Sequence, residues 1–559
     1  MRKQSAIESD ASPTQQTGAV RFAGIVPYLI FLIHVYSVFA LTEDDCYITL
    51  RYGANLAAGH GAVYNIGDRV EGFTSFLHML VDALICRIFG PSDPLFAVKI
   101  ASVLFGLLTL AATYRLARAA RLTHTGAVVA QTVIAASFSF AASSVNGLET
   151  TLYTFFLAVA LTSLLREVDP DAASERFTSG FLLFIATLAR PDAMVLFGFL
   201  LVARLISSRH GLPSMGRSLV KWALAYLIPF AGFVLARVAY FGTPLPNTYY
   251  AKSNPLLPSI KQGLIYLLGK FPLDRWFDLK TGVVSAFHNA GPIQVITFTL
   301  YALTFWLVTI SGLREMRRQR HVAFILATVI IGQIAFILRS GGDWMASWRF
   351  VVAILPVIAI AQTANLRNLV EGQSEPTPRF AKLACPVYAV ALVSIGFFLH
   401  HPSWGSIGFT TRGYTMMGTS RWGPLWRQLG DYIDQRMPHG CVVATTEVGY
   451  PGYVNRDKTI IDMAGLVDKT ISHLKVPHNF AGVNPERWCV PGDPIYNYLE
   501  QRRPDYILTF FVTPSTPAHP LGKYDLVDTF DAPAFFHEGV VKFYVYRRNT
   551  TDQRGSPER

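Results

Sequence analysis

Three consecutive acidic residues, Glu43, Asp44 and Asp45, follow the first long apolar segment of the chain, residues 22–41. A carboxylate beside a bilayer is costly when it is buried and unpaired, so acids at such a place are candidates for a functional site. Acids also favour the first turn of a helix. In that case these three would only cap the helix that follows and stay solvated.

The segment after the acids is predicted to form a helix that ends at a glycine-containing turn, residues 59–61. The spacing i, i+7 and i+11 places Asp44, Arg51 and Asn55 on one face of that helix. A carboxylate and a guanidinium group on one face are typical of the wall of a binding site. Arg51 and Asn55 are therefore candidate substrate-binding residues.

The composition is that of a polytopic membrane protein. Of the 559 residues, 51% are hydrophobic and only 15% are charged, and the mean hydropathy is +0.32. The net charge of +12 comes largely from Lys and Arg in short loops between apolar runs, as the positive-inside rule requires. No basic stripe with interleaved aromatic residues is present, so we expect no nucleic-acid partner.

The five cysteines form no CxxC pair, which argues against a zinc site or a redox motif. Cys441 and Cys489 lie in the polar C-terminal part of the chain. If that part is exported, a disulfide between them is open.

Apolar segments of spanning or near-spanning length recur along the first 400 residues. They are 22–41, 95–114, 126–144, 148–165, 178–189, 192–206, 220–241, 293–312, 321–338, 350–364 and 383–400. Residues 73–90 are also apolar but carry His78, Asp82 and Arg87. If 73–90 lies along the membrane surface or re-enters, every basic loop becomes cytoplasmic. This choice predicts about eleven spans, with a cytoplasmic tail over 1–21.

The same topology gathers the polar segments without basic clusters on the opposite, external face. These are 42–94, 145–149, 189–193, 241–292 and 339–349, together with the region from 401 onward. Short apolar runs at 441–448, 458–465, 504–510 and 540–548 read as strands, and 423–437 has helical periodicity. We predict a transmembrane domain over 22–400 with an external loop at 42–94, followed by a soluble α/β domain over 401–559.

The external segments carry a family resemblance. "DDCYITLRYGANLAAGHGAVYNIGDRVEGFTSFL", beginning at Asp44, resembles the first external loop of bacterial GT-C glycosyltransferases, which take sugars from polyprenyl-phosphate carriers. The chain is most similar to the branch that contains the terminal arabinofuranosyltransferases of cell-wall arabinogalactan. "RPDA" (190–193), "GTPLPNTYYAK" (242–252), "GGDWM…RF" (341–350) and "IIDMAGLVD" (460–468) also match that branch. Cys46 and His78 depart from it, since the branch tends to have a small residue and an aromatic residue there.

The resemblance implies a chemistry. Transfer from a lipid-phosphate donor needs a base for the acceptor hydroxyl and cations near the phosphate. Asp44 is implied as the base, and Asp45 as a residue that orients it or binds a sugar hydroxyl or a metal ion. Adjacent acids can hold a divalent cation such as Mg²⁺ or Mn²⁺, but no further ligand set is evident, so metal dependence stays open.

Other residues of the external motifs are candidates for substrate contacts. Lys252, Arg190 and Arg349 are candidates for the donor phosphate, with snorkelling at a helix end as the alternative for the two arginines. The remaining substrate-binding candidates are Glu71, Asp192, Asn247, Tyr249, Tyr250, Asp343 and Trp344. The alternatives are an interface belt for the tyrosines and helix capping for Asp192. In the C-terminal domain, Glu447 and Asp462 are candidates for a contact with the glycan, but a solvated surface is the expected state for both.

These features together predict a membrane glycosyltransferase. It would move a single sugar, with a pentofuranose such as arabinose as one candidate, from a polyprenyl-phosphate donor to a cell-envelope glycan. The reaction would take place on the periplasmic side of a bacterial inner membrane, with inversion if a single base acts. The alternatives are a transporter or flippase of lipid-linked sugars, and a protein or lipid glycosyltransferase of the same superfamily. Transporters usually show internal repeats and acids near the bilayer midplane, whereas these acids gather at one face.

Overall fold

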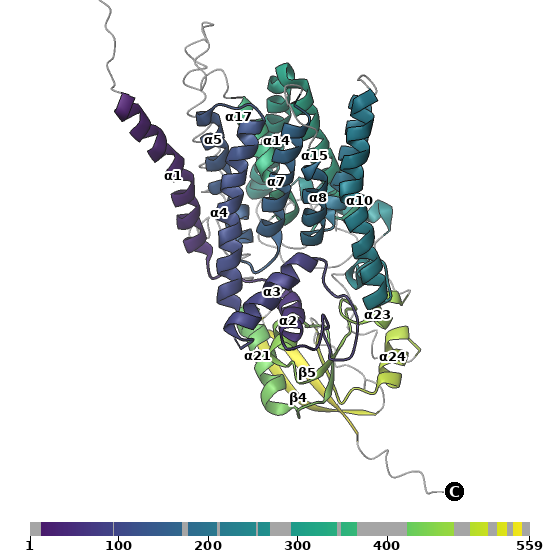
Figure 1. Ribbon diagram of the computed structural model, residues 1–559. Helices are drawn as coiled ribbons and strands as arrows, with labels where there is room; N and C mark the ends of the chain where they lie inside the picture. Colours follow the sequence, from purple (N-terminus) through teal and green to yellow (C-terminus); the bar gives the residue numbers. More distant parts are fainter. Residues whose placement is uncertain are drawn as a thin grey trace, which may run out of the picture.

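The computed structural model describes residues 13–92, 94–169, 177–208, 213–252, 255–268, 292–343, 348–365, 422–474, 492–511, 523–533 and 540–549. In these residues the chain forms a bundle of helices at one end and a domain with a β-sheet at the other (Figure 1). Helices α2 (Asp45–Ala57) and α3 (Phe76–Phe89) lie between the two parts.

The helices of the bundle follow the apolar segments of the sequence. They are α1 (Pro13–Val38), α4 (Leu95–Ala119), α5 (His124–Ala135), α6 (Phe138–Ser143), α7 (Thr150–Glu167), α8 (Thr178–Ala189), α9 (Asp192–Ser208), α10 (Pro213–Phe241), α14 (Pro292–Glu315), α15 (Arg320–Ser340), α16 (Arg349–Val352) and α17 (Leu355–Ala364). Figure 1 shows α1 on one flank of this bundle and α10 on the other. Shorter helices are η1 (Met316–Gln319), α11 (Asn247–Ala251) and α12 (Leu256–Leu267).

Three helical stretches of the described residues are long and apolar enough to cross a membrane. They are Leu95–Ala119, Arg217–Phe241 and Arg320–Ser340, and shorter apolar helices accompany them. The predicted count of about eleven spans is therefore not confirmed. The predicted span at 383–400 lies outside the described residues.

Two predicted spans are each broken into two helices. The segment 126–144 divides into α5 and α6, and 350–364 divides into α16 and α17. In the second case Pro356 stands in the first turn of α17. Proline has no N–H to donate and its ring crowds the preceding turn, so it fits a helix start and not a helix interior.

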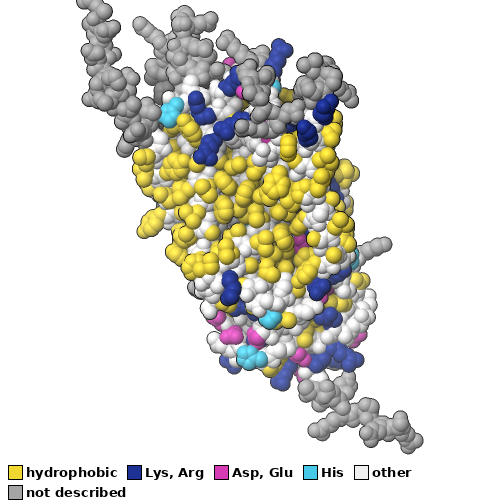
Figure 2. All heavy atoms as spheres, in the orientation of Figure 1, with side chains coloured by type: hydrophobic (Ala, Val, Ile, Leu, Met, Phe, Trp, Pro, Cys, Tyr) yellow, Lys and Arg dark blue, Asp and Glu magenta, His cyan; other side chains and the backbone are white. Residues whose placement is uncertain are grey.

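The outer surface of the bundle is apolar. Figure 2 shows a broad band of hydrophobic side chains, with Lys and Arg gathered along the edge farthest from the C-terminal domain. Leu104 of α4 and Leu235 of α10 are 54% and 70% exposed. An apolar surface of this extent is unfavourable in water and is typical of a face that contacts lipid.

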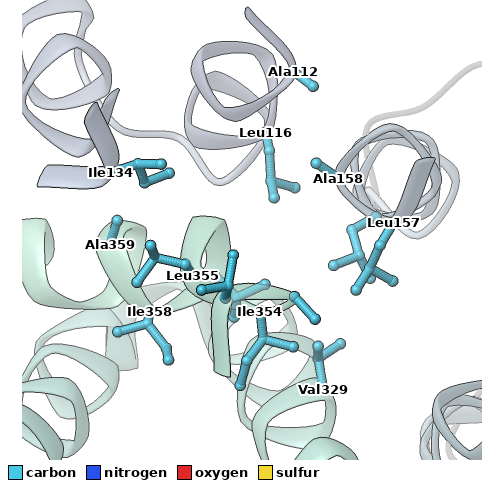
Figure 3. Packing of buried hydrophobic residues seen from close by; sticks show 14 of the residues in the cluster. Ala112, Leu116, Ile134, Leu157, Ala158, Val329, Ile354, Leu355, Ile358 and Ala359 are labelled. Carbon is cyan, nitrogen blue, oxygen red and sulfur yellow. The ribbon is translucent and has the colours of Figure 1, made fainter. Parts of the chain in front are cut away.

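The interior of the bundle is closely packed around α17. Leu355 of α17 lies in one apolar cluster with Leu116 of α4 and Ile134 of α5 (Figure 3). A Cβ at Gly312 of α14 would lie 1.7 Å from the carbonyl oxygen of Ala361, so only glycine permits this approach. Close packing of this kind, rather than exclusion of water, holds helices together in a bilayer.

The C-terminal part forms the predicted α/β domain. Its elements are α21 (Trp422–Arg436), β1 (Val442–Thr445), α22 (Tyr450–Val454), β2 (Thr459–Asp462), α23 (Lys469–His473), α24 (Pro494–Arg502), β3 (Tyr506–Phe511), β4 (Tyr524–Pro533) and β5 (Val540–Arg548). The strand order is β2-β1-β3-β5-β4. Strands β2, β1 and β3 are parallel, whereas β5 is antiparallel to both β3 and β4. The sequence did not predict β4, because Asp525, Asp528 and Asp531 interrupt its apolar pattern.

Candidate functional site

The three acids lie where α2 meets the bundle and the C-terminal domain. Asp44 is the residue before α2 and Asp45 is its first residue, yet the Asp44 side chain makes no capping bond to the helix. Glu43 and Asp44 are only 7% and 8% exposed. The backbone N–H of Glu43 donates to the carbonyl of Asn146 (3.1 Å). The alternative in which these acids are solvated helix caps is therefore wrong for Glu43 and Asp44.

On the bundle side, two arginines share one carboxylate. Glu149, the residue before α7, accepts from Arg190 at 2.7 Å and lies 4.0 Å from Arg349. All three residues are buried or nearly so, so the snorkelling alternative for the arginines is wrong. Sequence reasoning missed Glu149, because its only signal was the polar stretch 145–149 between apolar segments.

The Arg190 side chain is fixed by the motif that contains it. The residue before a proline favours an extended backbone, and Arg190, with φ −153° and ψ 138°, ends α8 in that conformation. Its Nε donates to Asp192 Oδ1 at 3.0 Å. Gln333 of α15 also donates to Asp192, at 3.3 Å. Asp192 is thus fully buried as a partner of protein groups, and its predicted substrate contact is not supported.

Arg349 is held by the turn that precedes it. Gly341 and Gly342 have φ of +81° and +79°, a backbone conformation that glycine adopts without strain. This turn places Asp343, whose Oδ2 accepts from Arg349 Nε at 2.7 Å. Trp344, predicted to contact substrate, lies outside the described residues.

Asp45 belongs to the cation-rich side of the site. Burial raises the pKa of Asp45, and the positive charges of Lys252 and Arg349 oppose that rise. Lys252 itself is exposed and follows α11. Asp45 thus shares a surrounding with the candidate phosphate-binding residues, and the charge of Arg349 acts on Glu43 as well.

Asp44 is turned toward the C-terminal domain. Its Oδ1 accepts from the backbone N–H of Tyr450 at 2.8 Å, and a Cβ at Gly449 would overlap the Asp44 carboxylate. Burial raises the pKa of Asp44 well above its usual range, and the charge of Glu447 raises it further. The two adjacent aspartates therefore have different surroundings.

The two acids of the C-terminal domain that were expected on a solvated surface differ in burial. Glu447 Oε2 accepts from Trp426 Nε1 at 3.0 Å, and burial raises the pKa of Glu447. Asp462 is fully buried and accepts from the N–H groups of Ala464 and Val467. Asp462 thus fixes the loop after β2, and its expected surface position is wrong, whereas Glu447 is only partly buried.

Arg51 is a structural residue between the 42–94 loop and the C-terminal domain. It is 1% exposed, and all five guanidinium N–H donors have protein acceptors. These are the carbonyls of Tyr64, Gly452, Asn455 and Lys458 and the side chain of Asn65. No donor is left for a substrate. The predicted substrate contact of Arg51 is therefore wrong, although its position on the Asp44 face of the helix was inferred correctly.

Asn55 has a similar structural role. Its Nδ2 donates to the carbonyls of Val63 (2.8 Å) and Tyr64 (3.0 Å), which folds the loop back on α2. In that loop, Asn65 exchanges two hydrogen bonds with the backbone of Ile460 in the edge strand β2 (2.8 and 3.0 Å). The predicted substrate contact of Asn55 is therefore not supported, because its amide is used within the loop.

Asn247 and Glu71 join α11 to its neighbours. The Nδ2 of Asn247 donates to the carbonyls of Gly465 and Leu466 at 2.9 Å, and its Oδ1 accepts from Ser472 at 2.7 Å. Glu71 forms an ion pair with Arg237 (2.8 Å). Asn247 docks the 242–252 segment onto the C-terminal domain, and Glu71 holds the 42–94 loop to α10. Neither predicted substrate contact is supported, because both side chains have partners within the protein.

The two tyrosines of the same segment differ. Tyr249 is 48% exposed, so the structure leaves it accessible to lipid or substrate. The ring of Tyr250 lies 4.3 Å from the ring of His473 in α23. Tyr250 thus adds to the contact between this segment and the C-terminal domain.

Among the described residues, no group of three or more His, Cys, Asp or Glu side chains could hold a metal ion. Asp44 and Asp45 remain the candidate pair for a divalent cation, without a third ligand of this kind in those parts of the chain. Cys441 is buried, and Cys489, its predicted partner, lies outside the described residues.

Comparison with known sequences gives two likenesses. A family model described as a domain of unknown function (DUF8728) matches residues 416–551. The terminal β-(1→2)-arabinofuranosyltransferase of Mycobacterium tuberculosis is 28% identical over 332 residues, which cover 54% of this chain and 49% of that protein. The chain thus matches about half the length of this relative.

Comparison with solved structures gives the fold. ArnT from Cupriavidus metallidurans bound to undecaprenyl phosphate has a TM-score of 0.53 at 14% identity, covering 97% of this chain and 100% of that one. The oligosaccharyltransferase of Archaeoglobus fulgidus has a TM-score of 0.50 at 13% identity, covering 87% and 69%. Together with the curated relative, these likenesses confirm the predicted resemblance, and the solved structures show the GT-C fold.

Proposed function

We propose that this protein is a glycosyltransferase that moves one sugar from a polyprenyl-phosphate donor to a glycan of the cell envelope. The observation that carries the proposal is the division of the acidic pair. Asp45 lies in the field of Lys252 and Arg349, whereas the charge that acts most on Asp44 is the carboxylate of Glu447. The Asp45 side holds cations beside the carboxylates of Asp343 and Glu149, whereas the charges that act on Asp44 are those of carboxylates. This difference suits a reaction in which an anionic leaving group departs on the Asp45 side and an acceptor hydroxyl approaches on the Asp44 side.

The donor phosphate belongs on the cation-rich side. Arg190 and Arg349 are already paired with carboxylates, so their guanidinium groups are held in fixed positions. Lys252 is exposed at the end of α11, and a flexible ammonium group can follow a phosphate as it leaves. We assign Lys252 to the phosphate, with Arg349 and Arg190 behind it.

Asp44 is the proposed base. In an inverting displacement the acceptor oxygen attacks the anomeric carbon from the face opposite the phosphate. The hydroxyl proton passes to the Asp44 carboxylate, the new bond from oxygen to carbon forms, and the bond from carbon to the phosphate oxygen breaks. The electron pair of that bond stays on polyprenyl phosphate, which needs no proton to leave. A carboxyl whose pKa is raised toward the working pH is suited to such a transfer.

The sugar and the side of the membrane are proposed from separate observations. The arabinofuranosyl group in the name of the M. tuberculosis relative makes a pentofuranose the preferred sugar. We propose that the C-terminal domain and the acids lie in the periplasm. The Lys and Arg side chains along the far edge of the apolar band (Figure 2) support this orientation under the positive-inside rule.

The test is transfer by the purified full chain in detergent. Farnesyl-phosphoryl arabinofuranose serves as donor and a synthetic arabinofuranosyl disaccharide as acceptor, with donors carrying other sugars in parallel. We expect a trisaccharide and farnesyl phosphate in equal amounts, detected by mass spectrometry. The proposal fails if folded protein releases farnesyl phosphate from no donor of the panel.

A further inference from the structure

The edge of the C-terminal sheet that usually binds ligands is turned toward the acidic pair. In α/β sheets, ligands bind beyond the carboxyl ends of parallel strands. Strands β1 and β2 are parallel neighbours that end at Thr445 and Asp462. The loop after β1 reaches Asp44 through Tyr450, and the loop after β2 reaches Asn247 through Leu466. This edge therefore forms part of the wall around the acids.

The loop after β1 is fixed in the residues that directly follow Glu447. The hydroxyl of Tyr64 donates to the carbonyl of Val448 at 2.6 Å, and Arg51 donates to the carbonyl of Gly452. Gly449 lies so close to Asp44 that a side chain there would overlap the carboxylate. The backbone that carries Glu447 thus has one position relative to Asp44.

The Glu447 side chain lies in an unusual place for a carboxylate. Trp426 Nε1 holds its Oε2 at 3.0 Å, and among the described residues no ion pair with a cation within 4.0 Å is found for it. Its charge acts on Asp44, and the charge of Asp45 acts on it. A partly enclosed carboxylate beside two others costs stability, so its presence calls for a ligand that donates hydrogen bonds.

We propose that Glu447 binds the acceptor. Its carboxylate accepts hydrogen bonds from hydroxyl groups of the acceptor sugar, while Trp426 positions it beside Asp44. The ligand class is a neutral, hydroxyl-rich saccharide, because an anionic acceptor would meet three carboxylates. This inference rests on the proposed glycosyl transfer and adds a residue from the C-terminal domain to the site.

The experiment separates acceptor binding from donor use. Purified Glu447→Gln is assayed with farnesyl-phosphoryl arabinofuranose, with and without the synthetic arabinofuranosyl disaccharide. We expect the ratio of transfer to donor hydrolysis to fall about 10- to 100-fold, which corresponds to the loss of a hydrogen bond to a charged group. The KM for the disaccharide should rise by a similar factor. Trp426→Phe should change the ratio in the same direction but less, because the carboxylate remains.

The matched control is Glu500→Gln, an exposed glutamate on α24 of the same domain, which should keep the wild-type ratio. An unchanged acceptor KM in folded Glu447→Gln overturns the inference. An equal loss of transfer and donor hydrolysis also overturns it, because Glu447 would then serve the donor or the fold. If wild-type protein consumes no donor of any sugar, the proposed function itself fails, and this inference fails with it.

Discussion

The site has two walls, one formed by the bundle and one by the C-terminal domain, and they differ in how their charged groups are paired. On the bundle side, Glu149, Arg190 and Arg349 neutralise one another through ion pairs. On the side of the C-terminal domain, the Asp44 carboxylate is held by a backbone amide and faces Glu447 without a cation between them in the parts of the chain that the structure describes. The adjacent residues Asp44 and Asp45 thus have different electrostatic surroundings, because each faces a different wall.

The largest expected effect is a loss of transfer when Asp44, which faces the C-terminal domain, is replaced. Asp44→Asn keeps the size of the side chain and can still accept from the amide of Tyr450, but it removes the proposed base. Transfer should fall about 10²- to 10⁴-fold, measured by product formation under saturating donor and acceptor. Asp68→Asn, an exposed acid in the same loop, is the control. Near-normal turnover by a well-folded Asp44→Asn protein would move the base to Asp45.

The next effect concerns the stability of the contact that Arg51 makes between the 42–94 loop and the C-terminal domain. Arg51→Ala leaves several buried carbonyls without donors, so the free energy of unfolding should fall by about 2–4 kcal/mol. Thermal melts in detergent measure this change. Added donor should not restore the lost stability, because Arg51 contacts only protein groups. A melt equal to that of the wild type would show that Arg51 does not stabilise this contact.

A smaller effect, on the KM for the donor, is expected when Lys252 is replaced. Lys252→Ala should raise the KM for farnesyl-phosphoryl arabinofuranose about 10- to 100-fold through the loss of a charge-assisted hydrogen bond. Lys252→Arg should show a smaller rise in this KM, because the guanidinium group keeps the positive charge. Lys261→Ala, an exposed lysine on the neighbouring helix α12, tests for a general effect of charge. Unchanged donor KM in Lys252→Ala would make the residue an interface anchor.

The smallest effect is a displacement along the pH axis. Because burial and Glu447 raise the pKa of Asp44, the base is protonated over a wider range of acidic pH than an exposed aspartate. Activity should be full at high pH and fall as pH drops through this raised pKa. In Glu447→Gln, the acidic limb of kcat should move to lower pH, because a negative charge near Asp44 is gone. If the acidic limb stays at the same pH in this variant, the charge of Glu447 does not act on Asp44.

The sequence predicted which loops share one face of the molecule better than it predicted the roles of the residues in those loops. Arg190 came from one motif and Asp343 and Arg349 from another, and the structure brings the two motifs into one network. The reason is that an alternation of apolar and polar segments determines which loops share a membrane face. Which side chains in those loops contact one another does not follow from that alternation.

The errors concern residues whose partners lie far along the chain. The face of α2 that carries Arg51 was inferred from spacing, but its acceptors at Gly452 and Lys458 are about 400 positions away. Asn247 was likewise assigned to substrate, although it binds the loop after β2. Periodicity identifies the face of a helix and not what covers it. The docking of the C-terminal domain could not be predicted from the sequence for this reason.

The most direct measurement is a cryo-EM structure of the full chain with a non-hydrolysable polyprenyl phosphonate sugar. We expect the phosphonate group beside Lys252 and Arg349, with the anomeric carbon directed toward Asp44 and Glu447. Phosphonate density against Asp44 and Glu447, with the sugar on the side of Arg349, would contradict the division of the site into a donor wall and an acceptor wall.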